Sequence, residues 1–434
     1  MKRMSGVAAI GLLLVAPMLA ARARQAQPAV TDFVTLGRAA IEELTVGNFD
    51  KFIERLDPKA GAALTRDKLA ALWRNITRQA GAFQKITAVQ VQDVQGAHTA
   101  TVTCAFEEQN LAFRVSFNNE GRVVGFFLEP ADTPWTAPSY VNPSAFSELS
   151  VTVGQYKLPG TLSMPNGMGP FPAVVLVHGS GPHDRDETIG PNKPFRDVAG
   201  GLASRNIAVL RYDKRSLVAP QTVRTVNEEV VEDAKAAIGL LSNESKVDRT
   251  RIIVIGHSLG GTLAPRIAAD DPRTTGIVIM AGAVRPLEDL LVDQVRYLTG
   301  PDSKETAAVE EAVKKMRDPE LTASSTIDVL GARMPGAYLL DLRNYRPADV
   351  AASLKIPIAV LQGQRDYQVT QVDFELWKKA LAGRPNVMLK LYPTLNHLFM
   401  PGTGPSRPDE YMRAAHVDEQ VIVDLAAWIK NSKQ

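Results

Sequence analysis

A serine between glycines is the feature of this chain that most directly predicts chemistry. The sequence G-H-S-L-G occupies residues 256–260, between an apolar run at residues 251–255 and a helical pattern that begins near Thr262. Glycines at both ends of such a turn permit the sharp change from strand to helix that exposes the serine hydroxyl. We therefore predict that Ser258 is a nucleophile, and the alternative is a glycine-rich turn with a capping serine.

A serine hydroxyl reacts when a base accepts its proton and an acid orients that base. His397 and His416 are the only histidines that follow Ser258 in the sequence. His397 stands in a loop after the last predicted strand, whereas His416 falls in a helical region where a solvent-facing histidine is the ordinary expectation. We predict that His397 is the base.

The acid is expected after the preceding strand. Asp366 follows the apolar run at residues 358–361, and the 31 residues from Asp366 to His397 leave room for one helix and one strand. Asp373 is the alternative, but it begins the next predicted helix, where a carboxylate commonly offsets the helix dipole. We predict that Asp366 is the acid.

Acyl transfer also needs N–H donors for the negative charge that develops on the carbonyl oxygen. The backbone N–H of Leu259 follows the nucleophile directly, and the glycine-rich loop at residues 178–182 carries the N–H of Ser180. A loop after an earlier strand supplies the second donor in folds with this kind of serine turn. We predict Leu259 and Ser180 as oxyanion donors, and a simple turn is the alternative for Ser180.

The elements that must position these residues follow from six short apolar runs. They lie at residues 171–177, 207–212, 251–255, 276–280, 357–361 and 387–392, with helical patterns between them, for example at 226–241 and 374–382. This alternation predicts an α/β fold with a mostly parallel sheet. Ligands bind at the carboxyl ends of such strands, where the predicted site residues stand.

Residues 284–352 interrupt the strand pattern with helical spacing, which predicts a helical cap over the strand ends. Tyr297, Met334, Tyr338 and Tyr345 could line a pocket there, although packing is the more common role of such residues. Glu288, Asp289 and Asp293 could hold a substrate amine, or simply belong to a helix surface.

A separate domain is predicted before the sheet. Residues 30–130 show two helical stretches followed by four alternating runs, which is typical of a small α+β domain with an antiparallel sheet. A Pro-rich linker at residues 131–147 follows, with a boundary near residue 135, so the catalytic domain is expected at residues 148–434. His98 is interpreted as a surface histidine. The element order resembles the cone-shaped domains of the nuclear-transport-factor and cystatin type, which can bind ligands or form homo-oligomers.

The first residues have the layout of a signal peptide, with Lys2 and Arg3 before an apolar run and a small-residue site that ends at Ala23. Residues 1–23 are therefore expected to be removed on export to the periplasm or the medium. Cys104 is the single cysteine, so no internal disulfide can form. With signal removal, no stable membrane span is expected.

Composition agrees with a globular protein. Hydrophobic residues make up 45% of the chain and charged residues 22%, which excludes a disordered, collagen-like or coiled-coil chain. Lys and Arg number 49 and Asp and Glu 47, so nucleic acid is not an expected partner.

The second domain resembles an α/β-hydrolase over roughly residues 145–434. The serine turn, the stretch at residues 178–186 and the stretch at residues 212–215 are similar to exported bacterial esterases and to the serine aminopeptidase-like branch. The resemblance implies a triad of Ser258, Asp366 and His397, oxyanion donors at Ser180 and Leu259, and no metal or organic cofactor. A metal cluster of His178, His183, Asp184 and Asp186 is the disfavoured alternative, because the spacing of known metal motifs is missing. We read Asp213, Lys214 and Arg215 as a charged loop.

These residues predict a serine hydrolase that cleaves small-molecule carboxylic esters through an acyl-enzyme. A serine peptidase that acts on short peptides or amides with the same triad is the alternative. A non-catalytic binding module and a lipase are further alternatives, and acyl-chain and alcohol preferences do not follow from the sequence.

Overall fold

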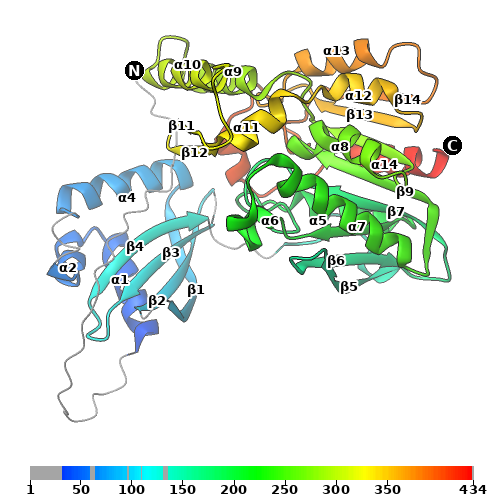
Figure 1. Ribbon diagram of the computed structural model, residues 1–434. Coiled ribbons are helices and arrows are strands. Elements are labelled where there is room, and N and C mark those ends of the chain that lie inside the picture. Colours follow the sequence, from blue (N-terminus) through cyan, green and yellow to red (C-terminus); the bar gives the residue numbers. More distant parts are fainter. Residues whose placement is uncertain (1–31, 59–63, 95–96, 109, 131–134, 433–434) are drawn as a thin grey trace. The chain divides into compact units, whose positions relative to one another are not determined.

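The computed structural model describes residues 32–58, 64–94, 97–108, 110–130 and 135–432. They form two compact units (Figure 1). The first unit contains the described residues up to Trp135 together with Tyr411–Ala414, and the second contains Thr136–Glu410 and the residues from Ala415 onward. The predicted signal peptide at residues 1–23 lies outside the described residues.

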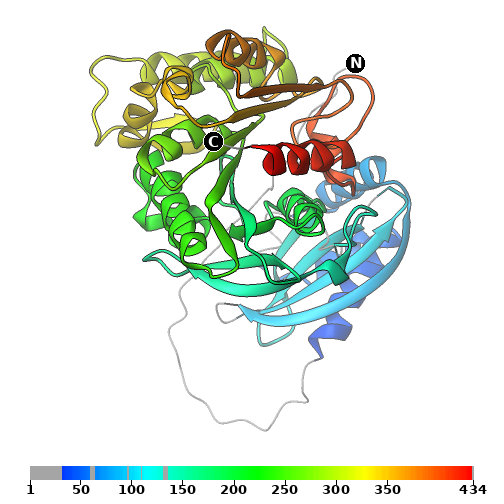
Figure 2. The same ribbon diagram turned by 90° about the vertical axis from the view of Figure 1, so that its right-hand side faces the viewer.

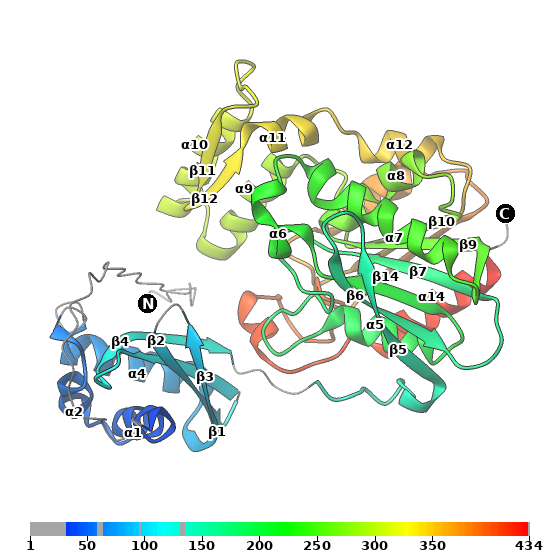
Figure 3. The same cartoon turned by 60° about the horizontal axis from the view of Figure 1, so that its bottom comes forward.

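The first unit is a small α+β domain, as predicted. Its helices are α1 (Phe33–Thr45), α2 (Phe49–Glu54) and α4 (Arg66–Ala80), and its antiparallel sheet has the order β1 (Phe83–Val94), β2 (Ala97–Phe106), β3 (Asn110–Phe117) and β4 (Val123–Pro130). Figure 3 shows the helices gathered on one face of this sheet. His98 lies within β2, and its ring stacks on that of Phe33 with 4.1 Å between the ring centres.

The second unit contains an eight-stranded sheet in the order β14-β13-β10-β9-β7-β8-β6-β5. Six neighbouring strands, β14 to β8 in this order, pair in parallel and correspond to the six predicted runs. Their bounds are β7 (Phe171–Val177), β8 (Ala208–Tyr212), β9 (Val247–His257), β10 (Gly276–Met280), β13 (Ile358–Gly363) and β14 (Val387–Tyr392).

Successive residues of a strand face opposite sides of the sheet, and here both sides are covered. Val175 and Val254 face one core with α7 (Glu232–Asn243), α8 (Leu259–Asp270) and α13 (Gln371–Ala380). Leu176 and Ile255 face the other core with α5 (Pro194–Ala203) and α14 (Glu419–Asn431). Figure 2 shows the two helical layers, with α14 in red. Burial on both faces explains why these strands are continuous apolar runs.

The sheet begins earlier than predicted. The antiparallel strands β5 (Phe146–Val153) and β6 (Leu158–Pro165) extend the sheet beyond β8. Strand β5 begins two residues before residue 148, the expected start of the catalytic domain. The short segments between strands are η1 (Pro143–Ala145), α6 (Arg215–Val218), η2 (Pro220–Thr222), the π-helix η3 (Asn227–Val231) and η4 (Pro408–Met412).

The cap prediction was wrong in one respect, because the insertion is not wholly helical. It contains α9 (Leu287–Thr299), α10 (Lys304–Met316), the antiparallel pair β11 (Thr326–Val329) and β12 (Ala332–Pro335), then α11 (Gly336–Arg343) and α12 (Pro347–Ser353). Figure 3 shows the pair beside α10. Ile327 and Val329 point into a small cap core with Val309 and Met316. The two strands are too short and too exposed to form an apolar run.

Across the described residues, no helix is both long enough and apolar enough to cross a membrane.

Candidate active site

Ser258 lies at the sharp turn between β9 and α8. Its backbone has φ 52° and ψ −116°, a conformation that L-residues rarely adopt and that is typical of strained functional turns. The turn requires both flanking glycines, because a Cβ at Gly256 would lie 2.1 Å from the Gly260 carbonyl oxygen, and one at Gly260 would lie 2.2 Å from the Val177 oxygen. Leu259 is the first residue of α8, so its N–H has no acceptor within the helix.

Asp366 and His397 form the hydrogen-bonded pair that an acid and base need. His397 Nδ1 lies 2.7 Å from Asp366 Oδ2, and both residues are buried. Asp366 Oδ1 accepts the N–H groups of Gln368 and Val369 at 2.8 and 3.0 Å, which fix the carboxylate. A carboxylate at Nδ1 places the proton on Nδ1 and leaves Nε2 as a base.

His397 also lies beside the serine turn. The ring centres of His257 and His397 are 4.8 Å apart, and His257 Nε2 lies 2.9 Å from the His397 carbonyl oxygen. His257 directly precedes Ser258, so these contacts join the loop that carries His397 to the turn that carries Ser258. The hydrogen bond from a serine to its base often tightens only when substrate binds.

The two alternative residues are occupied elsewhere. Asp373 accepts the N–H groups of Val284 and Arg285 at 3.0 Å and pairs with the Arg285 guanidinium at 2.9 Å. His416 lies in the coil before α14, not in a helix, and its Nδ1 is 3.1 Å from Asp197 on α5.

The predicted oxyanion loop lies against the serine. A Cβ at Gly179 would be 3.1 Å from Ser258 Cβ. Ser180 follows and is exposed, and its carbonyl oxygen lies 2.7 Å from His183 Nε2. The structure therefore brings the Ser180 backbone and the start of α8 to the same turn.

Comparisons with known proteins identify the family of this chain. Residues 174–415 match the alpha/beta hydrolase family, and residues 38–126 match a family described as protein of unknown function (DUF3887). Esterase EstD from Thermotoga maritima is 40% identical over 396 residues, which cover 90% of this chain and 93% of that protein. The chain belongs to the α/β hydrolase family.

More distant relatives are similar over smaller parts or at lower identity. Esterase FrsA from Klebsiella pneumoniae is 28% identical over 161 residues, 37% of this chain and 36% of that protein. A solved esterase structure from Pyrococcus furiosus is 17% identical with a TM-score of 0.46, and the match covers 70% of this chain and 98% of that one. The match to EstD and to the family supports a carboxylesterase-like hydrolase.

A second buried pair of this hydrolase was not anticipated from the sequence. Glu187 Oε1 accepts the Gly179 N–H at 2.6 Å, and Glu187 Oε2 lies 2.9 Å from His257 Nδ1. The second contact is an ion pair and not a well-aligned hydrogen bond. Burial has the largest single effect and by itself raises the pKa of Glu187, but the combined effects of His257, His183 and His178 outweigh it and lower that pKa to about 2. Burial has the largest single effect and by itself lowers the pKa of His257, but Glu187, together with the His397 carbonyl and the charge of Asp366, raises it above its ordinary value.

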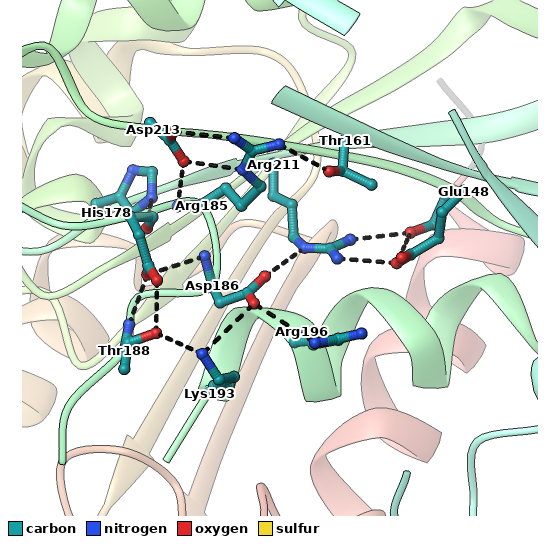
Figure 4. Close-up of polar contacts among 12 residues, drawn as sticks. Glu148, Thr161, His178, Arg185, Asp186, Thr188, Lys193, Arg196, Arg211 and Asp213 are labelled. Carbon is teal, nitrogen blue, oxygen red and sulfur yellow. Dashed lines mark hydrogen bonds and ion pairs between the residues drawn. The ribbon is translucent and has the colours of Figure 1, made fainter. Parts of the chain in front are cut away.

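Acidic and basic residues that follow the predicted oxyanion loop form a structural network with Glu148, Arg211 and Asp213 (Figure 4). Arg211 on β8 joins Asp186 and Glu148 at 2.8 Å, and Arg185 pairs with Asp213 at 2.9 Å. Asp184 accepts the N–H and hydroxyl of Thr188 at 2.9 and 2.7 Å. Among the described residues, no group of three or more His, Cys, Asp or Glu side chains is placed to hold a metal ion.

The cap residues proposed for a pocket make internal contacts with their polar ends. The hydroxyls of Tyr297, Tyr338 and Tyr345 donate to the Ser406 carbonyl oxygen, Glu229 and the Thr262 carbonyl oxygen at 2.9, 2.6 and 2.9 Å. Met334 packs against the cap core.

The acidic cap residues differ in their surroundings. Asp293 pairs with Arg285 at 2.6 Å, and Asp289 pairs with Arg317. Glu288 is 8% exposed and has no ion pair among the residues that the structure describes. Two of the three carboxylates are therefore neutralised within the cap itself.

Proposed function

We propose that this hydrolase cleaves carboxylic esters through an acyl-enzyme on Ser258. His397 Nε2 accepts the Ser258 proton as Oγ attacks the ester carbonyl carbon, and the resulting oxyanion binds the N–H groups of Leu259 and Ser180. Collapse of this intermediate breaks the bond to the alcohol oxygen, which takes the proton from His397.

The second half of the reaction uses the same groups. Water gives a proton to His397 and attacks the acyl carbon, and the carboxylic acid leaves as Ser258 recovers its proton. Asp366 holds His397 in the required tautomer and stabilises the imidazolium that forms in both steps.

The observation that carries this proposal is the 2.7 Å contact between His397 Nδ1 and Asp366 Oδ2 beside a serine held at φ 52°. The similarity to EstD over 90% of the chain supports an ester as the substrate. The pairing of Asp289 and Asp293 with arginines leaves Glu288 as the one of these three cap carboxylates without an ion pair among the described residues, so the peptidase alternative depends on Glu288 to hold the substrate amine.

The test is hydrolysis of short-chain and medium-chain nitrophenyl esters beside aminoacyl anilides, with Ser258→Ala as the comparison. We expect esters to turn over faster than anilides and the variant to lose at least about 10³-fold in kcat, because the nucleophile is removed. Faster cleavage of anilides would instead support the peptidase alternative. Ester turnover that persists in Ser258→Ala would refute the triad.

Export is a second part of the proposal. It rests on the basic start, the apolar run and the small-residue site that ends at Ala23. Expression of the full chain should give a periplasmic or secreted product whose mass corresponds to a start at Arg24, whereas an unprocessed product inside the cell would contradict export.

A further inference from the structure

Lys214 is a buried cation that the proposed reaction has not yet used. It is 2% exposed, although the sequence placed it in a charged loop after β8. Its Nζ donates to the Gly179 carbonyl oxygen at 2.6 Å and to the Gly181 carbonyl oxygen at 3.1 Å, and it lies 2.8 Å from Glu229 Oε1. An ammonium group has three N–H donors, so all of them are directed at these oxygens.

The first of these contacts acts on the peptide unit that carries a predicted oxyanion donor. The Gly179 carbonyl and the Ser180 N–H belong to one peptide unit, which is planar and trans, so they point in opposite directions. A hydrogen bond that fixes the direction of the carbonyl therefore fixes the direction of the N–H. Without this contact, rotation of the glycine backbone could turn the Ser180 N–H away from the serine.

The preceding peptide unit is also held. The Gly179 N–H donates to Glu187 Oε1 at 2.6 Å, so the units on both sides of the Gly179 Cα have charged partners. Hydrogen bonds to charged groups are stronger than those between neutral groups. These contacts hold Gly179 against Ser258. The approach is close, because a Cβ added at Gly179 would lie 3.1 Å from the Cβ of Ser258.

The ammonium also changes the electronic character of the amide. A cation at the carbonyl oxygen draws electron density from the amide nitrogen, and hydrogen bonds in series polarise one another. The N–H at the other end becomes a stronger donor, and this matters most when negative charge develops on the substrate oxygen. Glu229 neutralises the ammonium and accepts the Tyr338 hydroxyl at 2.6 Å, and both members of the ion pair are buried.

We propose that Lys214 is a positioning residue of the reaction, whose ammonium orients the 179–180 peptide and strengthens the Ser180 N–H as an oxyanion donor. This inference rests on the proposed function, because it gives Ser180 a role in acyl transfer.

The test variant is Lys214→Met combined with Glu229→Gln. Loss of Lys214 alone would leave a buried carboxylate without its counter-charge, which is strongly destabilising. The double variant contains neither charge, and the amide oxygen of its new glutamine can still accept the Tyr338 hydroxyl. Lys246→Met is the matched control, because Lys246 also donates to a glycine carbonyl, that of Gly167 at 3.1 Å, but in the loop before β7.

We expect the double variant to lose about 10- to 100-fold in kcat, somewhat less than deletion of a whole oxyanion donor, with KM changed less than about twofold. Affinity for a trifluoromethyl ketone, which forms an oxyanion on Ser258, should fall by a similar factor. Affinity for the product carboxylic acid should stay the same. The Lys246→Met variant should match the wild type in all three measurements.

Two results would overturn the inference. One is a double variant with wild-type kcat and ketone affinity. The other is an equal loss of affinity for ketone and product acid, which would indicate general distortion of the site. Wild-type and Ser258→Ala assays in the same series report on the proposed function separately, so ester turnover that depends on Ser258 stands whatever the double variant shows.

If the double variant melts below the assay temperature, the variant Lys214→Arg tests the proposed role of Lys214 instead. A guanidinium keeps the charge and the donors, and we expect it to retain more than half of the wild-type ratio of ketone to product affinity. A ratio reduced more than about tenfold in a folded Lys214→Arg variant would contradict a role that depends on charge.

Discussion

Asp366 and Asp373 are buried carboxylates that follow the same strand, and their hydrogen-bond partners give them different roles. Asp366 contacts the His397 ring, whereas Asp373 joins the start of the cap to α13 through Arg285. Substitution of each by asparagine separates catalysis from stability, because the amide keeps the size of the side chain and removes its charge.

For Asp366→Asn we expect kcat to fall by about 10⁴-fold, because an amide N–H facing Nδ1 favours the wrong imidazole tautomer. For Asp373→Asn we expect kcat to stay near the wild-type value and the free energy of unfolding to fall by about 1–3 kcal/mol, because Arg285 loses a charged acceptor. Steady-state kinetics and urea unfolding check both. A large loss of kcat in Asp373→Asn, together with a kcat near the wild-type value in Asp366→Asn, would make Asp373 the functional acid.

The buried pair of Glu187 and His257 should contribute to the stability of the folded protein in a pH-dependent way. The pKa of Glu187 is lowered from 4.5 to about 2, so its contribution is complete above pH 4.5 and is lost as the pH falls towards 2. The pKa of His257 is raised from 6.5, so its contribution is complete below pH 6.5 and is lost as the pH rises through the raised value. Both contributions are therefore present between pH 4.5 and 6.5.

The variant His257→Gln should lower the free energy of unfolding most within that window. The difference from the wild type should shrink at higher pH, because the wild-type imidazolium then loses its proton. Urea titrations at a series of pH values measure this difference. A constant difference from about pH 5 to about pH 9 would mean that His257 is neutral in the folded protein.

At the scale of elements, the turn from β9 to α8 depends on close backbone contacts. Gly260→Ala would place its Cβ 2.2 Å from the Val177 carbonyl oxygen of β7, and a backbone atom cannot give way as a flexible side chain can. We expect this variant to be inactive and to melt at a lower temperature than the wild type.

Gly239→Ala in α7 is the matched control. Its Cβ would lie 3.0 Å from the end of the Arg273 side chain, which is half exposed and can move. Alanine favours the helix over glycine by about 1 kcal/mol, so we expect activity to be kept and the melting temperature to be unchanged or higher. Wild-type activity in Gly260→Ala would show that the strand and helix can separate without loss of the turn.

The elements that could be predicted from the sequence are those whose burial produces a regular pattern of apolar residues. The parallel strands are apolar on both faces and appear as continuous runs, so their carboxyl ends and the candidate residues at 258, 366 and 397 could be located. The edge strand β5 has exposed residues at most positions, and β11 and β12 have four residues each, so neither leaves such a run.

The supporting residues could not be found in this way. Lys214 contacts the carbonyl of Gly179, which is 35 residues away in the chain, and Glu187 contacts the ring of His257, which is 70 residues away. The spacing of residues within one segment does not predict such contacts between loops. A lysine beside other charged residues is ordinarily solvated, and its burial became evident only from the fold.

At the scale of the whole molecule, the two units have separate hydrophobic cores. The first unit's core includes Cys104 and Phe113, both fully buried, and the cores on the two faces of the large sheet contain no residue of the first unit among those that the structure describes. Burial also raises the pKa of the Cys104 thiol to about 12, so thiol reagents that need a thiolate should not label it in the folded protein. Labelling of this single cysteine therefore reports unfolding of the first unit, while ester hydrolysis reports the second.

The variant Phe113→Ala should affect Cys104 labelling without affecting ester hydrolysis. Truncation of a buried phenylalanine costs about 3–5 kcal/mol, here by removing contacts of its ring with Trp73 and Phe126 at 6.0 Å between ring centres. In a urea titration, we expect the midpoint of Cys104 labelling to move to lower urea in this variant, while the midpoint for loss of activity stays at the wild-type value. Because neither large core contains Phe113, a shift of both midpoints by the same amount would mean that the two units unfold as one cooperative structure.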